Sequence, residues 1–363
     1  MPSGHSVASA RQEIVKLCHS GLDSVAFRRE AIRRLRRLVP VDSFWFATAD
    51  PLTLLFTSSL VEEIPEKATP LFVTNELLQD DVNKFTQLAA ARQSVNSLYF
   101  ATKGRLNDSP RYREICVPFG FGDELRAALN AGAGCWGFMC LHREKNGSNF
   151  TASEAATLAA LAPHLGHGLR AALLLSHAEK AHDEGAPGLL LLAEDLSLVA
   201  ATPAGERWLA EITDSPSRRE LPQVVYGAVA RLVALECNRI LPPDLLPRAR
   251  VRTRSGQWLV VHASRLSGRG GPGETAVILE PARGDEVAPL LLRAYGLSRR
   301  EAEVAQLVLQ GLGTLGIASK LSIAENTVQQ HLKSVFDKTG VGSRRELVAR
   351  VFSDHRRGKQ GAS

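Results

Sequence analysis

Residues 298–347 read SRREAEVAQLVLQGLGTLGIASKLSIAENTVQQHLKSVFDKTGVGSRREL, and this stretch decides the fold of the C-terminal part of the chain. Between Glu325 and Lys338, apolar residues recur with the period of an α-helix, about 3.6 residues per turn. The apolar face would consist of Val328, Leu332, Val335 and Phe336, and the opposite face of Asn326, Gln329, Gln330, Lys333 and Asp337. The pattern predicts a helix that packs through one side and projects amides and a lysine from the other.

Three further short helices are predicted around this one. Ser298 followed by Glu301 has the pattern of a capping box at the start of a preceding helix, and Gly311 suits a left-handed end for it. A short helix is expected over residues 314–321, and a fourth follows the turn at Gly342. Because only a few residues separate the second helix from the third, the segment predicts a helix-turn-helix unit.

From Leu297 to Phe352 the chain resembles, without gaps, the DNA-binding domain of LuxR-type transcriptional regulators. The family pattern L-S-x-R-E-x-E-V is matched by Leu297, Ser298, Arg300, Glu301, Glu303 and Val304, and further matches are Gly311-Leu312, Ile317-Ala318, Thr327-Val328, His331-Leu332, Gly340-Val341 and Glu346-Leu347. The resemblance implies that Gln329, Gln330 and Lys333 contact base edges and that Thr327, His331 and Lys338 contact phosphates.

The sequence departs from the family pattern at helix starts. Ala324 stands where the family usually has a capping Ser or Thr, and loss of such a cap typically costs about 0.5–2 kcal/mol. Gly313 and Gly316 replace polar residues in and before the second helix, where a glycine costs about 1 kcal/mol relative to alanine. We therefore expect the second helix to be marginally stable by itself. A helical fragment with no nucleic-acid role, its glutamines merely solvated, is the simplest alternative.

Length and composition indicate several soluble domains. With 363 residues, 44% of them hydrophobic and 23% charged, the chain predicts two or three globular domains. No run of eighteen apolar residues and no secretory signal pattern is present, so we expect no membrane span and a cytoplasmic location. The five cysteines show no paired metal-ligand spacing and are expected to be reduced core residues. From Gly284 to the end, 12 Lys and Arg face 8 Asp and Glu, a balance that suits a polyanionic partner.

Residues 1–182 predict an α+β domain. Helices are expected in the first forty residues, strands over 43–49, 52–56, 111–119, 124–131 and 135–142, and a long helix from Thr151. The run Ile115-Cys116-Val117-Pro118, the run Gly134-Cys135-Trp136-Gly137 and the long helix give this part a resemblance to a GAF domain. The resemblance implies a small-molecule pocket between sheet and loops. Its candidate lining is Trp45, Phe46, Tyr112, Trp136 and Phe138, although these aromatic residues could equally fill the core.

Residues 188–282 predict a second, smaller α+β domain after a linker over 181–188. Strands are expected over 189–192, 196–200, 248–253, 257–262 and 275–279, with helices over 203–212 and 223–239. This order, and the run Ala201-Thr202-Pro203-Ala204-Gly205-Glu206, resembles a PAS domain. The resemblance implies sensing and dimerisation.

No motif predicts catalysis, a metal or a cofactor. His164 and His167 lack a third ligand, the glycine run 268–273 lacks the Lys-Ser or Lys-Thr of a phosphate-binding loop, and nothing local orients a base toward Cys116 or Cys140. The sequence therefore predicts a multidomain regulator with an α+β GAF-like domain, an α+β PAS-like domain and an all-α C-terminal helix-turn-helix over residues 290–355. It would bind double-stranded DNA as a homodimer and respond to a small molecule. The alternative is a ligand-binding or dimerising module whose helical tail contacts protein.

Overall fold

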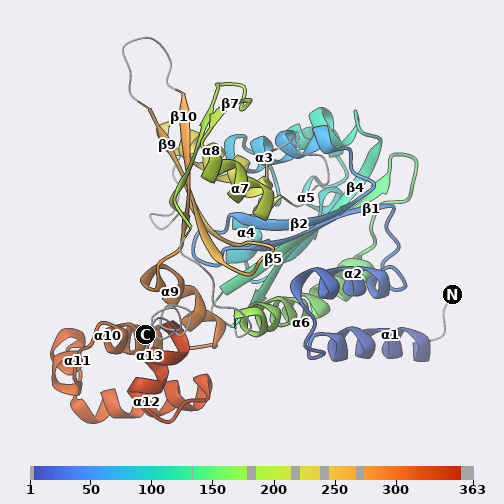
Figure 1. Ribbon diagram of the computed structural model, residues 1–363. Coiled ribbons are helices and arrows are strands. Elements are labelled where there is room, and N and C mark those ends of the chain that lie inside the picture. The colour runs from blue at the N-terminus through green and yellow to red at the C-terminus, as the bar shows by residue number, and fades with distance from the viewer. Residues whose placement is uncertain are drawn as a thin grey trace.

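The computed structural model describes residues 4–132, 134–177, 185–213, 221–237, 245–266 and 274–352, which form three units in chain order (Figure 1). The N-terminal unit consists of α1 (Gly4–Leu17), α2 (Ser24–Leu35), β1 (Ser43–Ala49), β2 (Phe56–Glu62), η1 (Glu66–Ala68), α3 (Thr69–Leu78), α4 (Phe85–Ala90), β3 (Val95–Ser97), α5 (Leu98–Ala101), η2 (Leu106–Asp108), the π-helix η3 (Tyr112–Cys116), β4 (Phe121–Ala131), β5 (Gly134–Glu144) and α6 (Ala152–His177).

The N-terminal strands form one antiparallel sheet in the order β2-β1-β5-β4-β3, with helices on both faces. Helices α1, α2 and α6 cover one face, where Phe44, Phe46, Trp136 and Met139 belong to a buried apolar core. The shorter helices α3 and α4 cover the other face, where a second cluster includes Phe56, Phe85 and Phe138. The predicted α+β layer is confirmed for this unit.

Two predicted strands of this unit were wrong. Residues 52–55 belong to a turn rather than a strand: the Asp50 carboxylate accepts a hydrogen bond from the Leu52 amide, Leu54 adopts φ +57°, and β2 begins only at Phe56. Residues 112–116 form a π-helix where a strand over 111–119 was expected. The cause lies in the buried Arg111, whose amide and guanidinium bond to acidic side chains and hold this segment over the sheet.

The middle unit has a second antiparallel sheet. Its elements are β6 (Gly188–Leu192), β7 (Leu198–Ala201), α7 (Pro203–Ile212), α8 (Gln223–Glu236), β8 (Arg248–Arg252), β9 (Trp258–Arg265) and β10 (Thr275–Pro281). The order is β7-β6-β10-β9-β8, so when the strands of each sheet are numbered separately, both sheets have the order 2-1-5-4-3. The first half of the predicted linker, residues 181–184, and the whole glycine run 268–273 lie outside the described residues.

Helix α8 lies between the two sheets. It packs on β9 of its own unit and, on the other side, against α3 and β2 of the N-terminal unit (Figure 1). Val225, Val229 and their neighbours enter the core of the middle unit, whereas Ala230 belongs to the phenylalanine-rich cluster of the N-terminal unit. A shift of either sheet therefore acts on this helix directly.

The C-terminal unit is all-helical. It contains α9 (Gly284–Ala294), α10 (Arg299–Leu309), α11 (Thr314–Leu321), α12 (Glu325–Thr339) and α13 (Arg344–Phe352). Helix α9 includes most of the residues between the predicted second and third domains, which end at 282 and begin at 290. Its apolar residues share a core with Trp258 of β9 and with α10–α13. Helix α12 lies on the side of the unit remote from both sheets (Figure 1).

Candidate nucleic-acid interface and sensor cavity

Helix α12 has the two faces that the sequence predicts. Val328, Leu332 and Val335 are buried against the other helices. The side chains of Asn326, Gln329, Gln330, Lys333 and Asp337 are exposed. Gln329 also donates to the Thr314 hydroxyl at the start of α11, at 3.1 Å, and this bond holds its amide near the helix junction. A helix anchored in this way can place amides in the major groove of a duplex.

The residues expected at phosphates lie along the edges of this exposed face. Thr327 and His331 are half-buried, and Lys338 is exposed at the C-terminal end of α12. The Lys338 ammonium already contacts the Glu301 carboxylate at 2.6 Å. Lys338 therefore has a structural role that the sequence did not reveal.

Glu301 joins the start of α10 to α12. Its carboxylate completes the predicted capping box with Ser298 at the start of α10, and it accepts bonds from Ser334 at 2.5 Å and Lys338 at 2.6 Å on α12. Burial alone would raise the pKa of Glu301, but the bonds from Lys338, Ser334 and Ser298 outweigh it and lower the pKa to about 2. The ionised carboxylate thus fixes α12 against α10.

The Glu301→Gln variant is expected to loosen α12 by about 1–3 kcal/mol near neutral pH, because the charge-assisted bonds to Lys338 and Ser334 weaken. Since the folded-state pKa is depressed, the ionised form stabilises the fold above about pH 4.5, and this stabilisation is lost as pH falls toward 2. Hydrogen exchange of α10 and α12 amides in both proteins measures the difference. The matched variant Glu303→Gln changes a half-buried glutamate of α10 that pairs with Arg299 and Arg300 of the same helix, and it should leave α12 protected. Equal loosening would contradict the assignment.

The starts of α11 and α12 lack side-chain caps, as the sequence predicts, and the marginal stability of α11 stays a prediction. Neither Gly313, before α11, nor Ala324, before α12, makes a side-chain cap bond. At the other end of α12, Gly340 adopts φ +66° and closes the helix in the left-handed conformation that glycine accommodates without strain. On α11, Leu315 is 70% exposed, and Ile317 and Ala318 supply its contact with the core.

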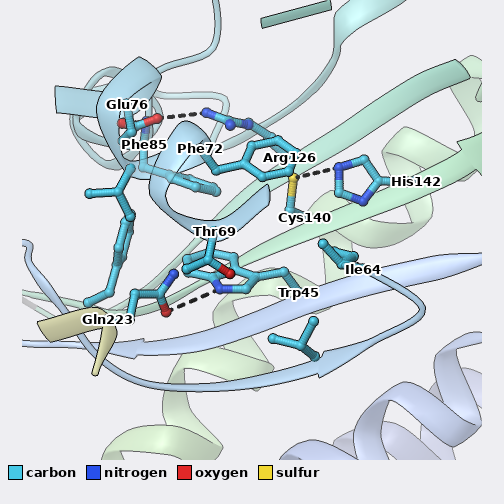
Figure 2. A pocket seen from close by; sticks show the side chains of 13 residues that line it. Trp45, Ile64, Thr69, Phe72, Glu76, Phe85, Arg126, Cys140, His142 and Gln223 are labelled. Carbon is cyan, nitrogen blue, oxygen red and sulfur yellow. Dashed lines mark hydrogen bonds and ion pairs between the residues drawn. The ribbon is translucent and has the colours of Figure 1, made fainter. Parts of the chain in front are cut away.

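A small cavity lies between the N-terminal sheet, α3 and α8 (Figure 2). It is lined by Trp45, Phe56, Val61, Ile64, Thr69, Phe72, Val73, Glu76, Phe85, Arg126, Cys140, His142 and Gln223. The Trp45 indole donates to the Gln223 amide oxygen at 3.2 Å, which links the wall of the cavity to α8. The cavity volume is about 30 Å³, room for roughly one or two water molecules. The structure therefore describes a closed form of this cavity.

The structure does not bring the five predicted pocket aromatics together. Trp45 alone of the five lines the cavity; Phe138 packs behind Phe85, and Tyr112 lies outside its wall. Phe46 and Trp136 are in the core on the opposite face of the sheet. Phe46 follows Trp45 directly in β1, and neighbouring strand residues point to opposite faces.

A β-bulge explains the separation of Trp136 from Phe138. Regular alternation would put both on one face, but the pairing of β4 with β5 shifts between Ala128↔Phe138 and Asn130↔Cys135, so β5 contains one extra residue. Gly137 sits at this point, where a Cβ atom would lie 2.5 Å from the Ala47 carbonyl oxygen. The bulge turns Trp136 away from the cavity, and no single-sequence pattern reveals it.

A buried ion network forms the floor of the cavity. The Glu124 carboxylate accepts a hydrogen bond from the Arg111 guanidinium at 2.7 Å and lies 3.1 Å from the Arg126 guanidinium, which also contacts the Glu76 carboxylate at 2.7 Å. All four side chains are at most 4% exposed. Burial would raise the pKa of Glu124, but Arg111 and Arg126 hold it well below its usual value. Buried charges are tolerated in proteins when they are paired in this way.

Four of the five cysteines are buried, as expected, but Cys237 is exposed. Burial, and then the neighbouring Glu124, raise the pKa of Cys140 well above its usual value. A buried thiol with a raised pKa is a poor nucleophile. The cluster around Cys140 therefore does not resemble the activated cysteine of an enzyme.

A larger cavity of about 510 Å³ lies where the three units meet. Its walls include Arg28 from α2, Arg252 from β8, Trp258 from β9 and Leu290 from α9. Arg28 belongs to a helix rich in arginine and is fully buried, donating to the Phe46 and Ser58 carbonyl oxygens at 3.0 and 3.1 Å. Arg28 therefore links α2 to β1 and β2, and it does not belong to the solvated face of this helix.

The compact arrangement of α10–α13, with its exposed polar helix, defines a helix-turn-helix DNA-binding domain. Residues 296–351 match the family of bacterial regulatory proteins of the luxR type, so this segment is a LuxR-type domain. None of the helices in the described part of the chain has the length and apolarity that a membrane span requires.

Known relatives match a stretch of similar length. A putative HTH-type transcriptional regulator from the exeN 3′ region of Aeromonas salmonicida is 48% identical over 59 residues, which are 16% of this chain and 30% of that protein. The HTH-type transcriptional regulator MalT of Yersinia pestis is 35% identical over 60 residues, 16% of this chain and 7% of that protein. The chain thus matches less than a third of either relative.

Solved structures align over larger shares of the chain, but with low similarity. The VqsR LBD domain from Pseudomonas aeruginosa aligns over 48% of this chain and 99% of its own length, with 17% identity and a TM-score of 0.32. A Vibrio cholera VqmA–ligand–DNA complex aligns over 46% of this chain and 80% of its own, with 17% identity and a TM-score of 0.22. These scores are too low to establish a common fold.

Proposed function

We propose that this protein is a transcriptional regulator that binds specific double-stranded DNA through α12 and responds to a small molecule in its N-terminal unit. The observation that carries the proposal is the division of α12 into a buried apolar face and an exposed face with two adjacent glutamines and a lysine. The matched luxR-type family and the regulators among the relatives support the same function. We place the protein in the cytoplasm and infer no catalytic activity.

In this proposal Gln329, Gln330 and Lys333 contact bases, and Thr327, His331 and Lys338 contact phosphates. Amides pair with adenine edges and lysine with guanine. A homodimer would present two copies of α12 to half-sites about 34–36 Å apart, one helical turn of DNA.

The N-terminal unit is proposed as a GAF-like sensor and the middle unit as a PAS-like unit that transmits the signal. A ligand larger than a few atoms fits the closed cavity only if its walls move, and the bond from Trp45 to Gln223 lies in that wall. Opening the cavity would therefore displace α8, which packs on β9. Strand β8 is the neighbour of β9 in this sheet, and its residues Arg248 and Arg250 contact Glu286 of α9. This chain of contacts connects the cavity to the DNA-binding unit.

Gln330→Ala is expected to weaken binding to the selected operator by about 1–3 kcal/mol and to relax specificity at one base pair. The operator is first obtained by selecting bound fragments from a random DNA library with the wild-type chain. Mobility shifts on operators altered one base pair at a time then locate the lost preference. Gln310→Ala, an exposed glutamine at the end of α10, is the control and should bind as the wild type does.

A uniform loss on all sequences would contradict base reading by Gln330. If no sequence is enriched and binding to fragments does not fall with salt, the alternative gains support: a ligand-binding or dimerising module whose helical tail contacts protein.

A further inference from the structure

Three metal-ligand atoms of different chemistry meet at the floor of the N-terminal cavity. They are Sγ of Cys140, Nε2 of His142 and Oε1 of Glu124, all within 4.8 Å of one another and all on buried side chains. Pairing of β4 with β5 sets Glu124 directly opposite His142, and Cys140 follows two residues away on the same face. Regular strand pairing therefore places the three residues together.

His142 is held in place but poorly hydrogen-bonded. Its ring stacks on Phe121 with centroids 4.6 Å apart, and the side chain is 1% exposed. Nε2 lies 3.5 Å from the Cys140 sulfur and 3.5 Å from the Glu124 carboxylate, and Nδ1 has no partner among the described residues. Nε2, the ring nitrogen that faces the cluster, thus makes only two long contacts, and a metal ion between the three residues would bond to it directly.

The distances between these atoms can be compared with those of a tetrahedral zinc site. Zinc bonds of about 2.3 Å to sulfur and 2.0–2.2 Å to nitrogen and oxygen place sulfur about 3.6 Å from either partner, and nitrogen about 3.4 Å from oxygen. The Sγ–Nε2 and Nε2–Oε1 separations, 3.5 Å each, agree with this geometry. The Sγ–Oε1 separation is shorter, 2.7 Å, because the protonated thiol donates to the carboxylate. Loss of that proton removes the bond and lets the two atoms separate.

The surrounding charges favour a divalent ion. The Glu124 carboxylate offers a negatively charged oxygen, and the Cys140 thiol can offer a second negative ligand once its proton leaves. Arg111 and Arg126 hold the Glu124 carboxylate in place, as partners of a metal ligand do.

We propose that Cys140, His142 and Glu124 bind a thiophilic divalent metal ion of the zinc type. Binding replaces the thiol proton: the S–H bond breaks, the proton leaves to solvent, and sulfur bonds to the metal with no change of oxidation state. Because Cys140 and His142 also line the cavity, the remaining coordination position would face it. Three protein ligands and an open position are typical of zinc sites that accept a further molecule.

The test uses the full chain, freed of metal with a chelator and titrated with Zn²⁺ against a chromophoric competitor. We expect one Zn²⁺ per chain and a loss of affinity of at least about 100-fold in Cys140→Ser and in His142→Gln. Cys135→Ser is the matched control, because Cys135 is a buried cysteine of the same strand outside the cluster. It should bind Zn²⁺ as the wild type does.

A spectrum of the wild-type chain loaded with Co²⁺ makes the test independent of how the variants fold. Thiolate ligation predicts a sulfur-to-cobalt charge-transfer band in the ultraviolet, absent in Cys140→Ser and present in Cys135→Ser. The proposal is overturned if the wild type binds no Zn²⁺ beyond the Cys140→Ser level, or if Co²⁺ binds without that band. Neither result depends on DNA binding.

Discussion

Replacing Arg126 with methionine is expected to destabilise the N-terminal unit by about 3–5 kcal/mol, the usual cost of removing one partner from a buried ion pair. The methionine retains the apolar stem that packs near Phe85, but it leaves Glu76 without its guanidinium and Glu124 with Arg111 alone. Loss of the pair costs more than loss of packing, because the carboxylates remain in a dry environment. Chemical denaturation followed by tryptophan fluorescence and circular dichroism measures the change.

Two further variants separate charge from shape. Arg105→Met removes an exposed ion pair with Asp108 and should change stability little. Adding Glu76→Gln to Arg126→Met removes one of the unpaired charges and should recover part of the loss. A double variant no more stable than Arg126→Met would show that the buried charge of Glu76 is not what destabilises the protein.

The C-terminal unit was the most predictable part of the chain, because its signals are local. The Ser298–Glu301 capping box, the spacing of Val328, Leu332 and Val335, and Gly311 after α10 each act within a few residues, and the structure has them as expected. The bond network of Glu301 was not predictable, since it joins residues more than thirty positions apart. The DNA-contact roles stay predictions.

Of the residues predicted to line the pocket, only Trp45 does so, and the reason is physical. On β4 and β5 the residues facing it include Glu124, Arg126 and His142, and polar side chains at alternate strand positions are the usual pattern of a solvated face. The burial of this face becomes visible only when the residues that pair with it are known. One of them, Glu76, lies fifty residues from Arg126 in the chain, so no local pattern reveals the pair. The sequence did offer one signal that was not used. Because side chains alternate between the two faces of a strand, Trp45 and Phe46 could not both line one pocket.

The three units meet at Asp50, a fully buried side chain at the end of β1. One carboxylate oxygen accepts the Leu52 amide at 2.9 Å and shapes the turn, while the other accepts the amide and guanidinium of Arg250 at 2.9 and 3.0 Å. Arg250 in turn donates to the Glu286 carbonyl oxygen of α9 at 2.6 Å. On the other side of the turn, Arg293 of α9 donates to the Pro51 carbonyl oxygen at 2.8 Å.

Asp50→Ala is therefore expected to cost about 3–5 kcal/mol and to loosen β8 and α9 together with the turn, because Arg250 loses its counter-charge. Asp195→Ala is the matched control: Asp195 makes the same carboxylate-to-amide bond two residues ahead, to Ser197 at 2.9 Å, in an exposed turn. Hydrogen exchange across residues 50–54, 248–252 and 284–294 of the full chain distinguishes the two effects. A turn defect alone would loosen only residues 50–54. That result would show that the junction of the three units does not depend on the Asp50 carboxylate. The path proposed from the cavity to DNA would then have to run through α8 and β9 without Asp50.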